Sequence, residues 1–207
     1  MRRFPVYFLI DVSDCMAGSS IEQTQKGMSS IIQRIKSDPY MLEMGTISVI
    51  TFSEKVTCVV PLIKLVDFHE PMLQIEEGKS SIDRVLDFLM EDIDKTLIKT
   101  TLGQKGDWMP VVFLFTNCIP TDNISFTRWN NSYWGMATIV VITISDDMNT
   151  QLWGQLTKNV VNLKEKESLM RFFRFVCIEP PYSSFNHNIA DDVVKLPPSP
   201  DDITIII

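Results

Sequence analysis

The stretch FPVYFLIDVSDCM, residues 4–16, decides the fold of this chain. Its first seven residues are continuously apolar and rich in β-branched and aromatic side chains. That pattern is typical of a strand buried on both faces of a parallel sheet. The run ends at Asp11, small polar residues follow, and a helical pattern begins near Ser19 or Ser20. A carboxylate and hydroxyls are thus expected at the carboxyl end of a strand, which is where open α/β sheets bind ligands.

Strand-like and helical segments alternate along the rest of the chain, which predicts βαβ units. The short connection 53–55 is typical of a hairpin, so one strand is expected to run antiparallel to its neighbour. We therefore predict an α/β fold: a three-layer Rossmann-like domain with a central, mostly parallel sheet, one antiparallel strand and helices on both faces. The predicted strands are 4–10, 46–52, 56–60, 110–115, 137–144 and 160–161, and the predicted helices are 20–37, 82–97, 148–156 and 165–177.

Local signals predict the ends of the first helix. The serine at position 19 or 20 is expected to cap it, with a Glu or Gln three residues later completing a capping box. The Asp-Pro pair at 38–39 is expected to end it. Residues 61–79 contain two prolines and a glycine, which predicts an irregular segment.

The composition excludes several classes of function. A net charge of −7 argues against a nucleic-acid partner, because phosphate binding needs a basic face. The only two histidines, His69 and His187, are far apart, which argues against a histidine metal site or a histidine general base. Neither glycine-rich phosphate-binding motif is present, so no nucleotide site is expected.

Four separated cysteines, at positions 15, 58, 118 and 177, form no C-x-x-C motif. This spacing favours free thiols in a cytoplasmic protein over a disulfide framework. The apolar run after Arg2 and Arg3 is too short for a signal peptide, and no run is long enough to cross a membrane. We expect a cytoplasmic protein that does not bind membranes.

The last thirty or so residues differ in composition from the rest. We predict a domain over 1–178 and an extended, proline-rich tail over 179–207. The tail ends in the strand-like sequence ITIII, residues 203–207. Two interpretations are open: this segment packs on its own domain, or it pairs with a sheet edge of a partner or a second copy.

Three polar segments are expected to meet at the carboxyl edge of the sheet. One follows the first strand, one precedes the helix at 82–97, and one follows the strand at 110–115. Carboxylate and hydroxyl oxygens are the ligands that hard divalent cations prefer. The side chains concerned are Asp11, Ser13, Cys15, Ser80, Ser81, Thr116, Asn117 and Cys118.

Several short sequences together resemble a known family. The arrangement resembles a von Willebrand factor A (vWA) domain, whose metal-ion-dependent adhesion site (MIDAS) uses D-x-S-x-S, a Thr in a second loop and an Asp in a third. More narrowly, it is similar to the bacterial TerY-type proteins of tellurite-resistance and chemical-stress operons. The resembling segments, which span about residues 4–176, are PVYFLID (5–11), SDPY (37–40), SVITF (48–52), VVPL (59–62), FLFTN (113–117) with PTD (120–122), and LTKNV (156–160).

The resemblance implies a degenerate MIDAS. Asp11 and Ser13 match the family pattern, and Ser80 stands in place of the family's Thr. Cys15 replaces the second serine, and Asn117 replaces the third-loop aspartate. In addition, Cys118 replaces a glycine, and Asp14 stands where a small residue is usual. The implied metal ligands are Asp11, Ser13, Cys15, Ser80 and Asn117, and the implied ion is Mg²⁺ or Mn²⁺.

These replacements leave two interpretations open. Sulfur is a poor ligand for magnesium, and Asn lacks the charge of Asp, so the site either binds its cation weakly or has lost it. In the second case, Asp11 and Asn117 would only hydrogen-bond the loops together. Asp14 is a candidate to restore the lost charge. Cys15 and Cys118 are a candidate pair for a softer metal or for a disulfide.

The resemblance also implies a function. TerY-type proteins work beside a PP2C-type phosphatase and a protein kinase, so we expect a protein–protein interaction module that acts as an adaptor and is not an enzyme. Four aromatic residues, Trp129, Tyr133, Trp134 and Trp153, are either hot spots for a partner or core. The alternative function is a haloacid-dehalogenase-like phosphotransferase. That chemistry needs a second carboxylate at position 13, where this chain has Ser.

Overall fold

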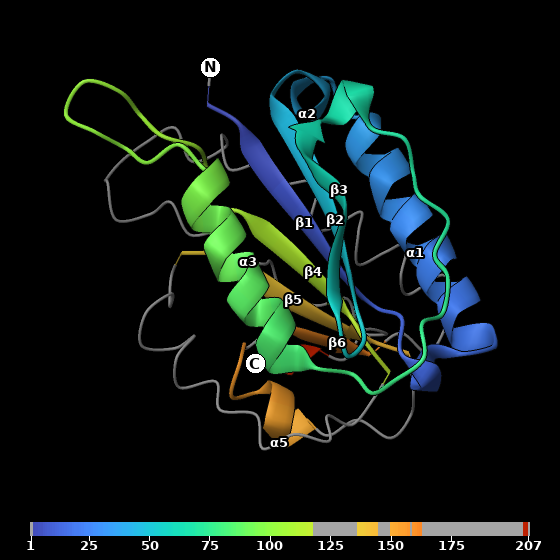
Figure 1. Cartoon of the computed structure of the whole chain (residues 1–207). Coiled ribbons are helices and arrows are strands. Elements are labelled where there is room, and N and C mark those ends of the chain that lie inside the picture. The colour runs from blue at the N-terminus through green and yellow to red at the C-terminus, as the bar shows by residue number, and fades with distance from the viewer. Residues whose placement is uncertain (1, 118–135, 145–149, 158, 163–204, 207) are drawn as a thin grey trace.

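The computed structural model describes residues 2–117, 136–144, 150–157, 159–162 and 205–206. Within these ranges a single sheet forms the centre of the molecule, with strand order β3-β2-β1-β4-β5-β6-β7 (Figure 1). The parallel strands are β1 (Phe4–Asp11), β2 (Gly45–Phe52), β4 (Val111–Phe115), β5 (Thr138–Thr143) and β6 (Val160–Asn162). Strand β3 (Val56–Lys64) runs antiparallel to β2, as the short connection predicted, and β7 (Ile205–Ile206) adds a second antiparallel pairing.

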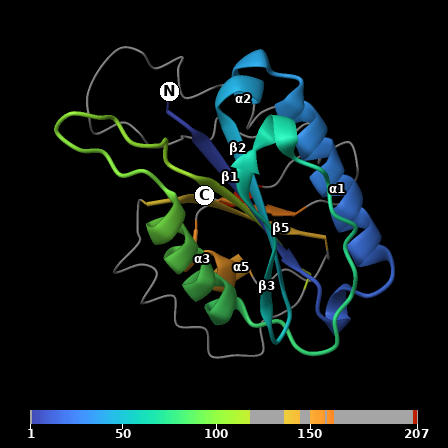
Figure 2. The same cartoon turned by 45° about the horizontal axis from the view of Figure 1, so that its top comes forward.

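Helices cover both faces of the sheet (Figures 1 and 2). Helix α1 (Ser19–Lys36) packs on one face, and α3 (Ile82–Thr96) and α5 (Thr150–Trp153) pack on the other. The short elements are α2 (Pro39–Met44) and the 3₁₀ turns η1 (Asp14–Met16) and η2 (Leu65–Asp67). The predicted fold class, a three-layer Rossmann-like α/β domain, is therefore confirmed.

Strand β1 is the centre of the core. All eight of its residues are buried, because β2 and β4 pair with its two edges and helices cover its two faces. Successive side chains alternate between the faces, so Phe8 packs on the α1 side and Leu9 on the α3 side. The ring of Phe8 lies 5.4 Å from that of Phe113 across the β1–β4 pair.

Three local predictions differ from the structure. Helix α1 has Gly18 at its N-cap with no side-chain cap, so the predicted serine cap and capping box are wrong. Asp38 does more than end α1: its carboxylate accepts hydrogen bonds from Tyr40 and Met41 N–H groups and so begins α2, which the sequence analysis missed. Strand β3 continues to Lys64, because pairing with β2 extends it past Pro61 on the open edge of the sheet.

The chain end at 205–206 pairs with β6 of its own sheet, which favours the first interpretation of that segment. The predicted helix at 165–177 and most of the tail over 179–207 lie outside the described residues. None of the helices within the described residues has the length and apolar character needed to cross a membrane.

A long strap, residues 68–79, runs beside α1 and leads the chain back towards the carboxyl edge (Figures 1 and 2). Gln25 of α1 holds its middle: the amide oxygen accepts from Leu73 N–H, and the amide nitrogen donates to the Pro71 carbonyl. At its end, Gly78 N–H donates to an Asp14 carboxylate oxygen, and Asp14 N–H donates to the Gly78 carbonyl. The strap therefore fixes the position of the start of α3 and of the residues just before it.

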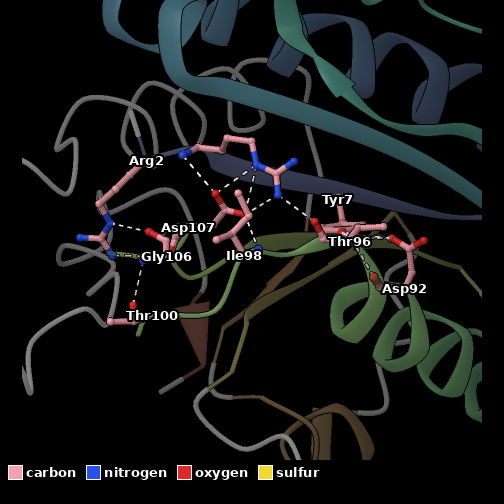
Figure 3. A network of polar contacts seen from close by, with 9 residues as sticks. Arg2, Tyr7, Asp92, Thr96, Ile98, Thr100, Gly106 and Asp107 are labelled. Atoms are coloured by element: carbon pink, nitrogen blue, oxygen red, sulfur yellow. Dashed lines mark hydrogen bonds and ion pairs between the residues drawn. The ribbon is translucent and has the colours of Figure 1, made fainter. Parts of the chain in front are cut away.

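The opposite end of β1 is fastened by a polar network (Figure 3). The Asp107 side chain is almost fully buried and accepts hydrogen bonds from the Arg3 guanidinium and from Ile98 N–H. Arg3 also donates to the carbonyl of Thr96, and the Tyr7 hydroxyl donates to the Asp92 carboxylate. These contacts tie β1 to the end of α3 and to the loop that follows it.

Replacement of Asp107 by Ala is expected to lower the free energy of unfolding by about 2 kcal/mol, because Arg3 and Ile98 N–H lose their acceptor. Denaturant unfolding measures this change. Lys95→Ala is the matched control, since it removes the exposed Lys95–Glu91 pair and is expected to cost less than about 0.5 kcal/mol. Equal effects of the two substitutions would contradict the assigned role of Asp107.

The same ion pair predicts a pH dependence. Burial alone would raise the pKa of Asp107, but the hydrogen bonds from Arg3 and Ile98 and the Arg3 charge outweigh it, so the pKa lies below its ordinary value. Below pH 3.8, that ordinary value, the unfolded carboxyl takes up a proton before the folded one does. Stability from this pair is therefore present above that pH and lost below it. Acid titrations of unfolding should show a steeper fall for the wild type than for Asp107→Asn.

Gly78→Ala is expected to cost about 1 kcal/mol and to loosen the strap. Gly78 has φ +116°, and a Cβ there would lie 2.7 Å from Cγ of Glu54. Gly103→Ala is the control, because a Cβ at Gly103 meets no atom within 4 Å. Thermal unfolding and hydrogen exchange at the Asp14 amide measure the effect. No difference between the two variants would show that the strap does not depend on Gly78.

Candidate metal site

The candidate site lies where the chain order across the sheet reverses. After β1 the chain crosses to β2, and after β4 it crosses to β5 on the other side. The carboxyl ends of β1 and β4 therefore flank a topological switch point, the place where α/β sheets bind ligands. Asp11 ends β1, and Thr116 directly follows β4.

The Asp11 carboxylate is held from three directions. One oxygen, Oδ1, accepts from the backbone N–H of Ser13 at 3.0 Å and from its hydroxyl at 2.6 Å. The other oxygen, Oδ2, accepts from the Thr116 hydroxyl at 2.7 Å. The parallel register of β1 and β4, which pairs Ile10 with Phe115, sets Asp11 beside Thr116. The carboxylate is thus fixed in place before any ligand arrives.

Asp11 is fully buried, and within the described part of the chain no Lys, Arg or His side chain forms an ion pair with it. Two hydroxyls and one amide stabilise the carboxylate but do not neutralise its charge. Buried charges in proteins are normally paired with an opposite charge or coordinate a metal. The surroundings of Asp11 therefore favour a bound cation.

Two further oxygen atoms at this edge are buried without a hydrogen-bond partner. Ser80 Oγ, just before α3, is one of them, and Asn117 Oδ1, just after β4, is the other. The Asn117 amide nitrogen donates to the Ser20 hydroxyl at the start of α1, which fixes its side chain. Hydrogen bonds of residues 76 and 78 to residues 12 and 14 hold the strap, which leads directly to Ser80, against the loop after β1. Both oxygens are free to act as metal ligands.

Asp14 and Cys15 also lie in the loop after β1. Cys15 is exposed and disulfide-bonded, with its partner outside the described residues, so the prediction of free thiols is wrong for Cys15. It holds for Cys58, which is free. Asp14 binds the Gly78 amide with one carboxylate oxygen, so part of its hydrogen-bonding capacity serves the strap. Cys118 lies outside the described residues.

The sequence analysis placed Thr116 at this edge but not among the implied metal ligands, and it did not place Ser20 there. Thr116 binds Asp11 directly, and Ser20 holds Asn117. The signal for Thr116 was its position at the end of a strand expected beside the first. Among the aromatic candidates, Trp153 is core: it is 2% exposed and packs beneath α3. Trp129, Tyr133 and Trp134 lie outside the described residues.

The donors fit a hard cation. They offer one carboxylate, two hydroxyl oxygens and one amide oxygen, which is the ligand chemistry of Mg²⁺ or Mn²⁺. No group of three or more His, Cys, Asp and Glu side chains that could hold a metal occurs in the described ranges. A cation here would depend on Asp11 for charge and on Ser13, Ser80 and Asn117 for neutral oxygens. This ligand set remains a prediction.

No protein-family model matches the sequence, and no curated protein matches it either. Solved structures do share the fold. Proximal thread matrix protein 1 (PTMP1) from the mussel byssus aligns with a TM-score of 0.60 and 15% identity, over 85% of this chain and 47% of its own. The ArnB paralog VWA2 from Sulfolobus acidocaldarius aligns with a TM-score of 0.58 and 15% identity, over 85% and 45%. This chain thus spans about half the length of each.

Two further solved structures also share the fold. BatB, a conserved hypothetical protein from Bacteroides thetaiotaomicron, aligns with a TM-score of 0.57 and 10% identity, over 81% of this chain and 94% of its own. A further structure of PTMP1, with a zinc-occupied MIDAS motif, aligns with a TM-score of 0.60 and 14% identity, over 85% and 47%. Likeness at this level of identity concerns architecture alone. On that ground, this chain has the fold of a von Willebrand factor A domain.

Proposed function

We propose that this chain is a protein-interaction module that binds its partner at the carboxyl edge of the sheet with the help of a divalent cation. The observation that carries the proposal is a buried, unneutralised Asp11 carboxylate at the same edge as two buried oxygens without partners, on Ser80 and Asn117. A cation would neutralise the first and bind the other two. The zinc-occupied MIDAS of a structural neighbour supports the same interpretation.

An octahedral cation held by these side chains keeps positions for ligands from outside the chain. An acidic side chain of a partner would supply both an oxygen and a charge there. That gives the edge a way to join two proteins, and it needs no chemical step. We therefore propose an adaptor and not an enzyme.

The phosphotransferase alternative is less well supported. Its mechanism needs an acid two residues after Asp11. The residue there is Ser13, and its hydroxyl donates to Asp11 Oδ1.

We further propose that this adaptor belongs to a bacterial tellurite or chemical-stress response and acts in the cytoplasm. Its partners would be a PP2C-type phosphatase and a protein kinase. The resemblance to TerY-type proteins supports this assignment.

Asp11→Asn tests the cation. The substitution keeps the shape of the side chain and removes the buried charge, so without metal the variant is expected to be at least as stable as the wild type. Mn²⁺ at about 100 times its Kd should stabilise the wild type by about 2.7 kcal/mol and leave Asp11→Asn unchanged. Thermal unfolding in EDTA and in Mn²⁺, with calorimetric titration, measures both. Equal Mn²⁺ binding by the two proteins would end the metal hypothesis.

Ser80→Ala separates ligation from folding. Its hydroxyl has no partner, so its removal should change the metal-free stability by less than about 0.5 kcal/mol and weaken Mn²⁺ binding. Thr46→Val is the matched control, since Thr46 Oγ1 is also buried and unpartnered but lies at the amino end of β2. A loss of Mn²⁺ affinity in Thr46→Val as well would mean that the effect is not local.

A pull-down from the native host, with and without EDTA, tests the partner. The wild type is expected to retain a PP2C-type phosphatase and a protein kinase, and EDTA or Asp11→Asn should release them. If both enzymes stay bound despite EDTA and Asp11→Asn, the adaptor role stands but the contact does not depend on a metal. Failure to retain either enzyme would contradict the assigned partners.

A further inference from the structure

The loop between α3 and β4 projects from the amino end of the sheet as a tongue, residues 98–106 (Figures 1 and 2). At its base, Ile98 N–H donates to the Asp107 carboxylate, and Asp107 N–H donates to the Ile98 carbonyl. Near its tip, Thr101 and Gln104 exchange two backbone hydrogen bonds. These bonds hold the tongue in a defined conformation.

The tongue carries apolar and basic side chains. Leu102 at its tip is fully exposed, and Ile98 at its base is 47% exposed. Lys99 and Lys105 are its charged residues, and it contains no Asp or Glu. Lys99 pairs with Asp94 of α3, whereas no carboxylate among the described residues forms an ion pair with Lys105. The tongue is thus a basic and apolar feature on a chain whose net charge is −7.

The strap has the complementary character. Its exposed apolar side chains are Met72, which is 84% exposed, and Ile75, which is 37% exposed. Between residues 70 and 77 it contains three exposed carboxylates and no Lys or Arg. Two of these carboxylates accept hydrogen bonds from neutral side chains, so their charge is not cancelled. The three are Glu70, Glu76 and Glu77.

We propose that this protein associates head to tail, with the tongue of one copy on the strap of the next. Leu102 then buries its exposed side chain against Met72 and Ile75, and Lys105 lies among the strap carboxylates. The tongue and the strap lie on opposite sides of the sheet, so one copy cannot join its own two surfaces (Figures 1 and 2). Each pair of copies keeps a free tongue and a free strap, so the contact repeats into rings or open assemblies.

The physical chemistry of the two surfaces favours this contact. Both are held by hydrogen bonds before they meet, which lowers the cost of ordering them on binding. The Debye length is about 8 Å at physiological ionic strength, so opposite charges at the contact act while the distant like charges of two acidic chains are screened. The contact is smaller than a standard interface and therefore weak. An assembly presents several carboxyl edges together, which raises the avidity for a partner with repeated sites.

Sedimentation velocity of the full chain tests the proposal, at about 0.15 M salt and from about 1 μM to about 1 mM protein. The wild type is expected to form complexes of more than two copies as its concentration rises, and to do so equally in EDTA. A wild type that stays monomeric, or that stops at two copies, would overturn the proposal. Assembly that EDTA abolishes would assign the contact to the carboxyl edge and overturn it as well.

Two substitutions of exposed residues block one surface each. Leu102→Asp places a carboxylate on the tongue, and Met72→Asp removes the main apolar side chain of the strap. Each variant alone is expected to self-associate at least about tenfold more weakly than the wild type. An equimolar mixture should form complexes of two copies and nothing larger, because only the tongue of Met72→Asp and the strap of Leu102→Asp remain intact. A mixture that behaves like the single variants contradicts the head-to-tail contact.

Matched variants control for folding and for net charge. Val66→Asp changes another exposed apolar residue, on η2, and should assemble like the wild type. Lys105→Glu and Lys64→Glu change the net charge equally, but only Lys105→Glu lies in the tongue and should weaken assembly. Thermal unfolding checks that every variant is folded. If Met72→Asp assembles like the wild type, the tongue meets a different surface and the proposal fails.

This contact goes beyond the proposed function and does not involve the candidate metal site. Its failure would leave the Mn²⁺ titrations of Asp11→Asn and Ser80→Ala unaffected. Conversely, a chain that binds no Mn²⁺ and still assembles through the tongue and the strap would retain the head-to-tail contact and lose the metal site.

Discussion

The structure depends on the pairing of β1 with β4 at the centre of the sheet. This parallel register buries both strands and sets Asp11 beside Thr116 at their carboxyl ends. The buried carboxylate cannot turn towards water, so its surroundings must satisfy it. Hydroxyls from two loops do this in part, and the negative charge remains unneutralised within the described residues. Folding thus fixes the position of this carboxylate before any ligand arrives.

The two ends of β1 have different roles. At the amino end, Arg3 and Asp107 pair with opposite charges, and the network of Figure 3 is closed by hydrogen bonds to the backbone. At the carboxyl end, no cationic side chain among the described residues pairs with Asp11, and Ser80 and Asn117 each keep an oxygen without a partner. Polar groups that are all hydrogen-bonded stabilise the fold, whereas buried polar groups without partners can bind a ligand.

The strap explains how a distant part of the sequence reaches this edge. Residues 68–79 have no regular structure, yet Gln25 and Asp14 bind them through their backbone groups. This satisfies polar groups of an irregular segment without a helix or strand. It also makes the position of Ser80 depend on Asp14. Asp14 therefore has a structural role in holding the strap.

The sequence alone determined the fold class and the strands of the central sheet. Continuous apolar runs such as residues 4–10 are typical of strands buried on both faces, and this local property is readable without coordinates. The sequence also placed Asp11 and Asn117 at the ends of strands. Other features were not readable in this way. The helix that begins at Pro39 depends on a local cap, and the extension of β3 and the disulfide of Cys15 depend on partners distant in sequence. Only the tertiary structure decided that Thr116 binds Asp11 while Ser80 and Asn117 keep unpartnered oxygens, because hydrogen bonds between separate loops depend on register and packing and not on sequence spacing.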